Sequence, residues 1–439
     1  MFSRMYLASQ RPCGRLFAAC SIAALTWLLT AAPARAHSET ADPAGALSLP
    51  QAVALALQAD PSLEAVASRQ RALEEQAVAD GALPDPMLRT GVLSLPTDSW
   101  NLGQEPMTQV VVGISQKFPR GRTRELRSEQ TREQSAALDE TLADQRLRIA
   151  LSVREDYLEV LKQLRLASIN EEAIEAFRDL ADITEDYYAT GRVQQQDVLR
   201  AAVELAKVED RSTRIAQEQD RARARLETWI GAAAYRDFAA DWPPLGPAPS
   251  LDGIRASLPE HPRIAALSQR MAVADTGIEL AEQRYRPEFG VDLAYGARSG
   301  DNMDGGARAD LFSVMVTMDL PLFPRNRQDR YKAVAVSEAS ATAFERDDAY
   351  RRMLAEAKLH LATRERQQER LNRFETDLLP DADYNAEASY AAYQSAVESL
   401  TTLMRARITE YELQLEYAEL RAEILKTQAR LQYLLGEKA

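Results

Sequence analysis

Cysteine is almost lacking in this 439-residue sequence, because its two cysteines, Cys13 and Cys20, both lie near the start. The rest of the chain therefore has neither a disulfide framework nor a thiolate metal site. Glycine and proline, at 18 and 20 residues, are too few for a collagen-like or disordered chain. Basic residues are fewer than acidic ones, 53 against 66, so the net charge is -13. Phosphate backbones need basic surfaces, so we expect no nucleic-acid partner.

Histidine is scarce as well, and the three histidines (His37, His261 and His360) stand apart from one another. No spaced Cys or His partner accompanies them, so we predict no metal site. The sequence contains no phosphate loop and no nucleophile motif. Its acidic residues are interleaved with arginines, which is typical of solvated helix surfaces rather than of a carboxylate pair. We therefore expect no catalytic site and no cofactor.

Long apolar runs are confined to the N-terminus. Residues 1–36 combine a basic start, an apolar run over about 16–34 and small residues at Ala34 and Ala36, which is typical of a secretory signal peptide. A membrane anchor helix and a lipid anchor on Cys20 are the alternatives. No later stretch approaches 18 consecutive apolar residues, so no membrane-spanning helix is expected after the signal.

The sequence contains a tandem repeat. The pentapeptide at 118–122 recurs at 323–327, and the segment 198–201 matches 403–406 at the same spacing. We predict two repeats, 47–236 and 258–436. The segment 237–257, rich in Pro, Gly and Ala, would link them.

Both repeats follow one internal plan: a first helix, two short strands and a very long helical hairpin. The expected ranges are 49–83 and about 261–284 for the first helices, about 87–118 and 288–322 for the strands, and 121–230 and 325–435 for the hairpins. No Gly or Pro lies between Gly121 and Gly191. Helices of such length indicate a coiled-coil-like assembly.

The strands alternate in polarity. In 289–295 and 312–320 every second residue is apolar, whereas Asp292, Thr317 and Asp319 belong to the opposite face. Strands of about nine residues suit an outer-membrane barrel with its apolar face toward lipid. Four strands cannot close a barrel, but three chains would supply twelve.

Several segments resemble the outer membrane efflux protein family, which is TolC-like. They are LSLPQAVALAL at the start, the paired junctions SQKFPRGRTRELR and DLPLFPRNRQDR, the turn YYATGRVQQQDVLRA, and the repeat ends LETWIG and LQYLLG. Two further segments, LPDPMLRTGVLSLP and EPMTQVVVGISQKFP, look most like the heavy-metal efflux branch.

The resemblance implies a mainly α fold with a small β part. Long antiparallel coiled-coil helices would form an α-barrel, and four strands per chain would contribute to a twelve-strand β-barrel of a homotrimer. It implies a passive exit duct for metal ions or drugs in the outer membrane of a Gram-negative bacterium, with the helices in the periplasm. Its partners would be outer-membrane lipid, a periplasmic adaptor and an inner-membrane pump, which we expect to be proton-driven. The alternative is a periplasmic coiled-coil adaptor or scaffold without a pore, but it would not explain the strand pairs.

The resemblance also places the helical turns at a periplasmic tip, where the tunnel closes and the adaptor docks. The second repeat departs from the pattern, with Ala396 and Thr402 at the places of Gly191 and Asp197. Three copies of Asp197 could select cations; the alternative is a solvated helix charge. The candidate tip and gate residues are Tyr188, Gly191, Asp197, Tyr393, Glu398 and Arg405.

Arginines recur at the two strand-to-helix junctions, where helix dipoles disfavour positive charge. We therefore predict that they reach anionic headgroups beside interfacial aromatics; ordinary solvated arginines are the alternative. The candidate membrane-interface residues are Phe118, Arg120, Arg122, Phe323, Arg325 and Arg327.

Overall fold

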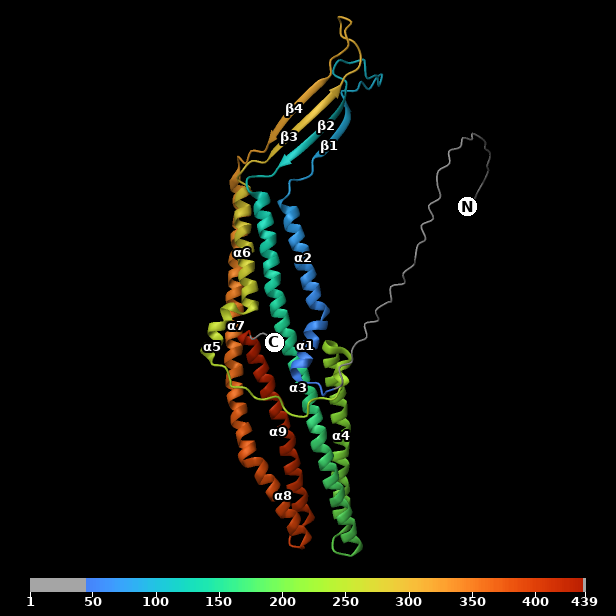
Figure 1. Cartoon of the computed structure of the whole chain (residues 1–439), viewed down its shortest axis with the longest axis vertical. Coiled ribbons are helices and arrows are strands. Elements are labelled where there is room, and N and C mark those ends of the chain that lie inside the picture. Colours follow the sequence, from blue (N-terminus) through green and yellow to red (C-terminus); the bar gives the residue numbers. More distant parts are fainter. Residues whose placement is uncertain (1–44, 437–439) are drawn as a thin grey trace, which may run out of the picture. The chain divides into compact units, whose positions relative to one another are not determined.

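The computed structural model describes residues 45–436. The predicted signal segment 1–36, with Cys13 and Cys20, and also His37, lie outside the described residues. In the described part, long helices carry a four-stranded sheet at one end (Figure 1). The elements are α1 Leu49–Ala59, α2 Pro61–Gly81, β1 Met87–Leu93, β2 Gln109–Phe118, α3 Thr123–Ala189, α4 Gln195–Ile230, α5 Leu251–Ser257, α6 Pro262–Gln283, β3 Phe289–Ala297, β4 Leu311–Met318, α7 Gln328–Arg373, α8 Leu379–Gln394 and α9 Leu400–Leu435, with short 3₁₀ turns at Gly231–Tyr235, Leu258–Glu260 and Pro324–Asn326.

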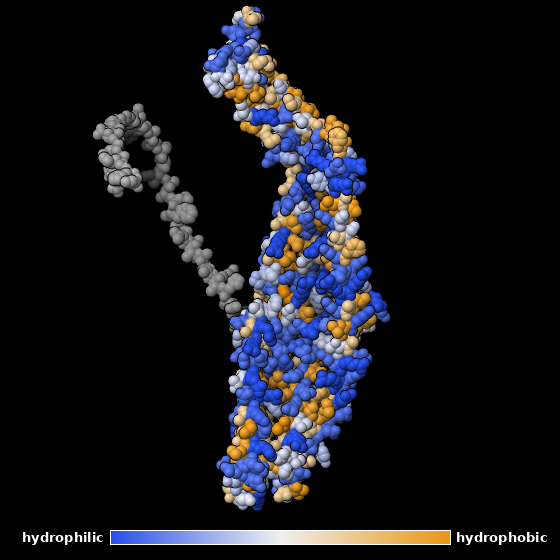
Figure 2. Space-filling view, turned by 180° about the vertical axis from the view of Figure 1, so that it is seen from behind, coloured by the Kyte–Doolittle hydropathy of each residue, from blue (hydrophilic) through white to orange (hydrophobic). Residues whose placement is uncertain are grey.

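The sheet is antiparallel throughout, in the order β1-β2-β3-β4. Residues opposite one another in the register share a face. One face is apolar across all four strands, and its large side chains are exposed: Leu88, Val92, Val110, Val112, Ile114, Leu293, Tyr295, Phe312, Val314 and Val316. Figure 2 shows hydrophobic residues gathered in this part of the molecule, below more hydrophilic loops. The register therefore confirms the alternation of apolar and polar residues that was predicted for these strands.

Below the sheet, neighbouring helices pack in the order α2, α3, α6, α7 (Figure 1). Farther from the sheet, α3 continues and packs against α4 and α9, and α8 packs against α9. The 67-residue α3 thus joins both groups of helices.

Apolar side chains form four separate clusters rather than one central core. Tyr157 is buried in the first cluster, where its hydroxyl donates to the Leu47 carbonyl at 2.8 Å and its ring lies 5.0 Å from that of Phe238. A proline-containing strap follows Phe238, and its Gly246 N–H donates to Gln428 at 3.1 Å. The segment expected as a linker is thus tied to the helices, and it contains α5.

The single helix predicted over 49–83 is wrong. The structure has two helices, because Asp60 is extended and caps α2 by accepting from the Ser62 N–H at 2.7 Å. Pro61 then stands at the first helical position, where its lack of an N–H is harmless.

A π-helical turn, Phe374–Leu378, joins α7 to α8. It precedes Pro380, whose ring would collide with the carbonyl four residues earlier in a regular helix. The wider turn accommodates that ring, so the long helix continues through the proline. No helix within residues 45–436 has the length and apolar character needed to cross a bilayer.

Candidate functional site

The second face of the sheet carries most of the polar and small side chains, together with a few apolar ones such as Met315. Arg89 on β1 donates to Asp292 on β3 at 3.2 Å, passing over β2. Gly113 lies on β2 between these strands, and a Cβ there would come within 2.8 Å of the Leu293 carbonyl oxygen and 3.1 Å of the Ala294 Cβ. Glycine at this position therefore permits the close approach of β2 and β3 beneath an ion pair.

The strand-to-helix junctions are held by ion pairs between the two halves of the chain. Arg120 pairs with Asp319 and lies 3.6 Å from Glu288. Arg122 pairs with Glu125 of its own half at 2.8 Å and lies 3.7 Å from Glu279 of the other half. Both charges are thus already compensated within the chain.

The other interface candidates are more open. Phe118 is 40% exposed and Phe323 is 86% exposed. Arg325 is exposed at the 3₁₀ turn before α7, and Arg327 borders a cavity. The predicted contact of these residues with lipid headgroups remains a prediction.

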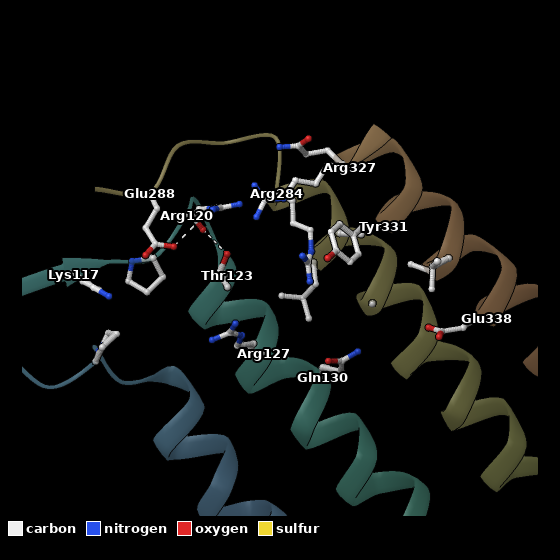
Figure 3. A pocket seen from close by; sticks show the side chains of 18 residues that line it. Lys117, Arg120, Thr123, Arg127, Gln130, Arg284, Glu288, Arg327, Tyr331 and Glu338 are labelled. Atoms are coloured by element: carbon white, nitrogen blue, oxygen red, sulfur yellow. Dashed lines mark hydrogen bonds and ion pairs between the residues drawn. The ribbon is translucent and has the colours of Figure 1, made fainter. Parts of the chain in front are cut away.

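That cavity, of about 570 Å³, lies where β2, α3, α6 and α7 meet. In Figure 3, basic side chains surround it, with Lys117 near Arg120 and Glu288, and Arg284 beside Tyr331. The Arg284 guanidinium lies 3.9 Å from the centre of the Tyr331 ring, a cation–π distance. Sequence reasoning missed Lys117, Arg127 and Arg284, because nothing in their spacing brings them together.

At the opposite end, the two helical turns share one geometry. After α3, Gly191 adopts a φ of 71°, and the Arg192 N–H donates to the Tyr187 carbonyl at 2.8 Å. After α8, Ala396 adopts a φ of 58°, and the Val397 N–H donates to the Ala392 carbonyl at 2.9 Å. Both are Schellman-type endings, which normally require glycine in the left-handed position.

The tyrosines of the two turns differ in exposure. Tyr188 is 46% exposed, whereas Tyr393 is 4% exposed and packs against Tyr187 at a ring distance of 5.7 Å. The second repeat thus supplies a buried contact to the first. The structure brings these turns to the same end of the molecule (Figure 1).

The charged candidates at the tip occupy distinct places. Asp197 lies in the first turn of α4 and accepts from the Gln194 N–H at 3.2 Å, so it caps that helix. Glu398 and Arg405 are exposed, and the Glu398 N–H donates to the Ala392 carbonyl. A cap explains an acid at Asp197 without reference to a gate, and a gate role remains a prediction.

Between the two ends, a half-buried ion-pair network joins α3 to α9. Lys426 donates to Glu159 at 2.6 Å and to Glu423 at 2.9 Å, and Lys162 pairs with Glu159 at 2.7 Å. Burial opposes the charge of Glu159, but hydrogen bonds from Lys162, Lys426 and Gln163 outweigh it and lower the pKa from 4.5 to about 2. This network stabilises the packing of the two repeats.

His261 is explained by packing. Its Nε2 lies 2.8 Å from the Tyr433 carbonyl, and its Nδ1 accepts from the Arg263 N–H at 3.2 Å. Burial lowers the pKa of the ring, so the neutral form is favoured. Among residues 45–436, no group of three or more His, Cys, Asp or Glu side chains is arranged to hold a metal ion.

A sheet with an exposed apolar face, carried on long paired helices, is typical of a protein that inserts its strands into a membrane. The family model described as "Outer membrane efflux protein" matches residues 52–232 and 253–437. The chain belongs to this family, as its sequence motifs predicted. A comparison with curated proteins by sequence gives no match.

Solved structures share the fold. The outer membrane protein VceC from Vibrio cholerae is 18% identical, with a TM-score of 0.74 over 88% of this chain and 96% of its own. The CmeC outer membrane channel of Campylobacter jejuni is 12% identical, with a TM-score of 0.74 over 88% and 85%. The MtrE outer membrane channel of Neisseria gonorrhoeae is 15% identical, with a TM-score of 0.72 over 89% of each chain.

The predicted TolC-like fold, mainly α with four strands, is confirmed. Family membership places the protein in the outer membrane of a Gram-negative bacterium, with its helices in the periplasm. Its activity is that of an efflux channel of a tripartite system rather than of an enzyme. Channels of this family are trimers that work with an adaptor and an inner-membrane pump.

Proposed function

We propose that three copies of this chain form a passive exit duct whose strands close into one twelve-strand barrel. The observation that carries the proposal is the state of the sheet in a single chain. Both outer strands, β1 and β4, have an unpaired edge, and the apolar face is exposed. An open edge and a large apolar patch both favour association, and lipid tolerates only closed sheets.

The strand directions permit closure. The four strands alternate in direction, so β4 of one chain runs antiparallel to β1 of the next. An even number of strands per chain keeps this relation at all three joints. The apolar face then meets lipid, and the face with Arg89 and Asp292 lines the lumen.

The helices continue the duct into the periplasm, and transport energy comes from the partner pump. We propose that the pump is proton-driven, that a periplasmic adaptor docks at the turns around Gly191 and Ala396, and that the cargo consists of metal ions or drugs. A ring of three Asp197 carboxylates at the tip favours cations. Phe118 and Phe323 contact the membrane interface, with Arg325 beside Phe323.

A periplasmic adaptor or scaffold without a pore is the competing function. It accounts for the long helices. It leaves the apolar sheet face exposed to water, with side chains such as Phe312 (68%) and Val316 (65%) unprotected. That exposure favours the channel.

The test is purification of the full-length protein from outer membranes in detergent, followed by mass determination and planar-bilayer recording. A trimer with ion-conducting events supports the channel. A soluble periplasmic monomer without conductance would overturn it.

Two neighbouring substitutions on β4 sharpen this test. Val314 and Met315 are almost equally exposed, at 61% and 62%, but they lie on opposite faces of the sheet. Val314→Arg puts a charge toward lipid, at a cost of about 2–4 kcal/mol, and should reduce trimer yield in the membrane. Met315→Arg puts the charge in the lumen and should insert normally. Equal yields of the two variants would contradict the assigned orientation.

A further inference from the structure

The cavity at the strand-to-helix junction has an excess of positive charge. Five basic residues line it (Lys117, Arg120, Arg127, Arg284 and Arg327), against the two acids Glu288 and Glu338. They lie on or next to β2, α3, the end of α6 and the start of α7, so both halves of the chain contribute. Such convergence of like charge around one cavity destabilises the empty site.

Most of these charges lack a carboxylate partner. Arg120 is neutralised by Asp319 and Glu288. Within residues 45–436, Lys117, Arg127 and Arg327 form no ion pair, and Arg284 is held by the Tyr331 ring instead. Figure 3 shows Lys117, Arg127, Arg284 and Arg327 arranged around the space between the helices.

Gln328, the first residue of α7, also lines the cavity. The helix dipoles do not decide the potential there, because α3 and α7 begin at the cavity while α6 and α2 end beside it. Gln328 is only 6% exposed, and its Oε1 has no hydrogen-bond partner. A bound group that carries both anionic oxygens and an O–H donor would satisfy the cations and this acceptor.

The side on which the cavity lies follows from the register. Lys117 is opposite Gly290, and Phe118 is opposite Phe289, so Lys117 leaves β2 on the polar face. The cavity that Lys117 lines therefore lies on the polar side of the sheet. In the proposed trimer this side is the lumen, so the location rests on the proposed function.

We propose that this cavity is an oxyanion site in the wall of the duct. It takes hydrogen phosphate or the phosphate group of a small organic solute, and three such sites surround the lumen where barrel and tunnel meet. Guanidinium groups match tetrahedral oxyanions through paired N–H donors, and the volume of about 570 Å³ accommodates a small organic phosphate. The site would give the duct a local preference for anions above the acidic tip.

The test measures binding of inorganic phosphate and of glycerol 3-phosphate to the full-length protein in non-ionic detergent, by ³¹P NMR titration. The variant Arg127→Gln/Arg327→Gln removes two cations that leave no carboxylate unpaired. We expect the Kd to rise at least about tenfold, because two charge-assisted contacts are lost. Gln328→Leu, which removes no charge, should weaken binding less.

The matched control is Arg132→Gln/Arg330→Gln. These arginines are exposed on the same two helices, α3 and α7, and do not line the cavity. The control should change the Kd by less than about twofold. If both double variants weakened phosphate binding equally, the attraction would be a diffuse property of the surface and the proposed site would be wrong. The proposal would also be wrong if the wild-type protein bound no phosphate. Tighter binding of glycerol 3-phosphate than of phosphate would identify an organic solute as the ligand; equal binding would identify the free anion.

Bilayer recording of the wild-type protein separates this inference from the proposed function. A conducting trimer that binds no phosphate refutes the site alone. A protein that binds phosphate but never conducts refutes the duct, and with it the place of the site in a lumen.

Discussion

The two tip turns predict opposite responses to exchanging glycine and alanine. Gly191 and Ala396 occupy the same left-handed position after their helices, with φ of 71° and 58°. No atom lies within 4 Å of a Cβ built on Gly191, so Gly191→Ala tests backbone conformation alone. The natural Ala396 already carries the strain that this substitution would create.

The magnitude follows from two opposing terms. Left-handed conformation costs a non-glycine residue about 1–2 kcal/mol. Glycine in turn costs about 0.4–1 kcal/mol of folding free energy relative to alanine, because it loses more conformational entropy on folding. Gly191→Ala should therefore favour local opening by about 0.5–1 kcal/mol, and Ala396→Gly should oppose it by the same amount. This corresponds to a twofold to fivefold change in the opening equilibrium.

The assay is hydrogen exchange of the intact protein in detergent, followed by mass spectrometry of peptides covering each turn. The reporting amides are those of Arg192 and Val397, which close the turns. Exchange should become faster at the first turn in Gly191→Ala and slower at the second in Ala396→Gly, with the unmutated turn as internal control. Changes of the same sign in both variants would refute the reasoning.

Four further predictions concern other parts of the chain. Gly113→Ala should lower the trimer yield on semi-native gels, because its Cβ would lie 2.8 Å from the Leu293 carbonyl oxygen. Gly91→Ala is the control and should not lower the yield, because no atom lies within 4 Å of a Cβ at that position. Equal yields of the two variants would contradict the argument that Gly113 permits the close approach of β2 and β3. Lys426→Met should destabilise the protein by about 3 kcal/mol. This value is at the low end of the range for breaking a buried ion pair, because Lys162 still pairs with Glu159. The loss of helical circular dichroism on heating measures the change in stability. Since the folded pKa of Glu159 is lowered to about 2, its stabilisation is complete above about pH 4.5 and is lost as pH falls toward 2; a wild-type protein equally stable at pH 5 and pH 2 would refute this. Asp197→Ala should raise single-channel conductance and weaken cation block. Asp197→Asn keeps an oxygen for the helix cap, so it should have the same effect if the charge is responsible. An effect of Asp197→Ala alone would assign the change to the cap.

The strands and the long helices could be predicted because each depends on local periodicity. Alternation at 289–295 predicted β3, and the register confirms that its apolar residues face the same way as those of β2 and β4. The break between α1 and α2 was missed, although Asp60-Pro61 carries a helix-start signal.

The site was less predictable, since it depends on contacts between the two halves. The recurring arginines were noticed, but the partners of Arg120 and Arg122 include Asp319 and Glu279, which only the tertiary structure brings near. The capping role of Asp197 had a local signal, an acid three residues after Gln194. Lys117 and Arg327 share a cavity only because β2 and α7 end and begin at the same junction.

The open edges of β1 and β4 have a genetic consequence. If each barrel needs an intact sheet from all three chains, a chain that pairs through one edge but cannot complete its own strands would prevent closure of the whole barrel. With equal amounts of normal and defective chains mixing at random, only about one trimer in eight would be free of a defective copy. Alleles that damage the sheet but preserve one edge should therefore be dominant over the normal copy, whereas alleles that prevent the chain from reaching the membrane should be recessive.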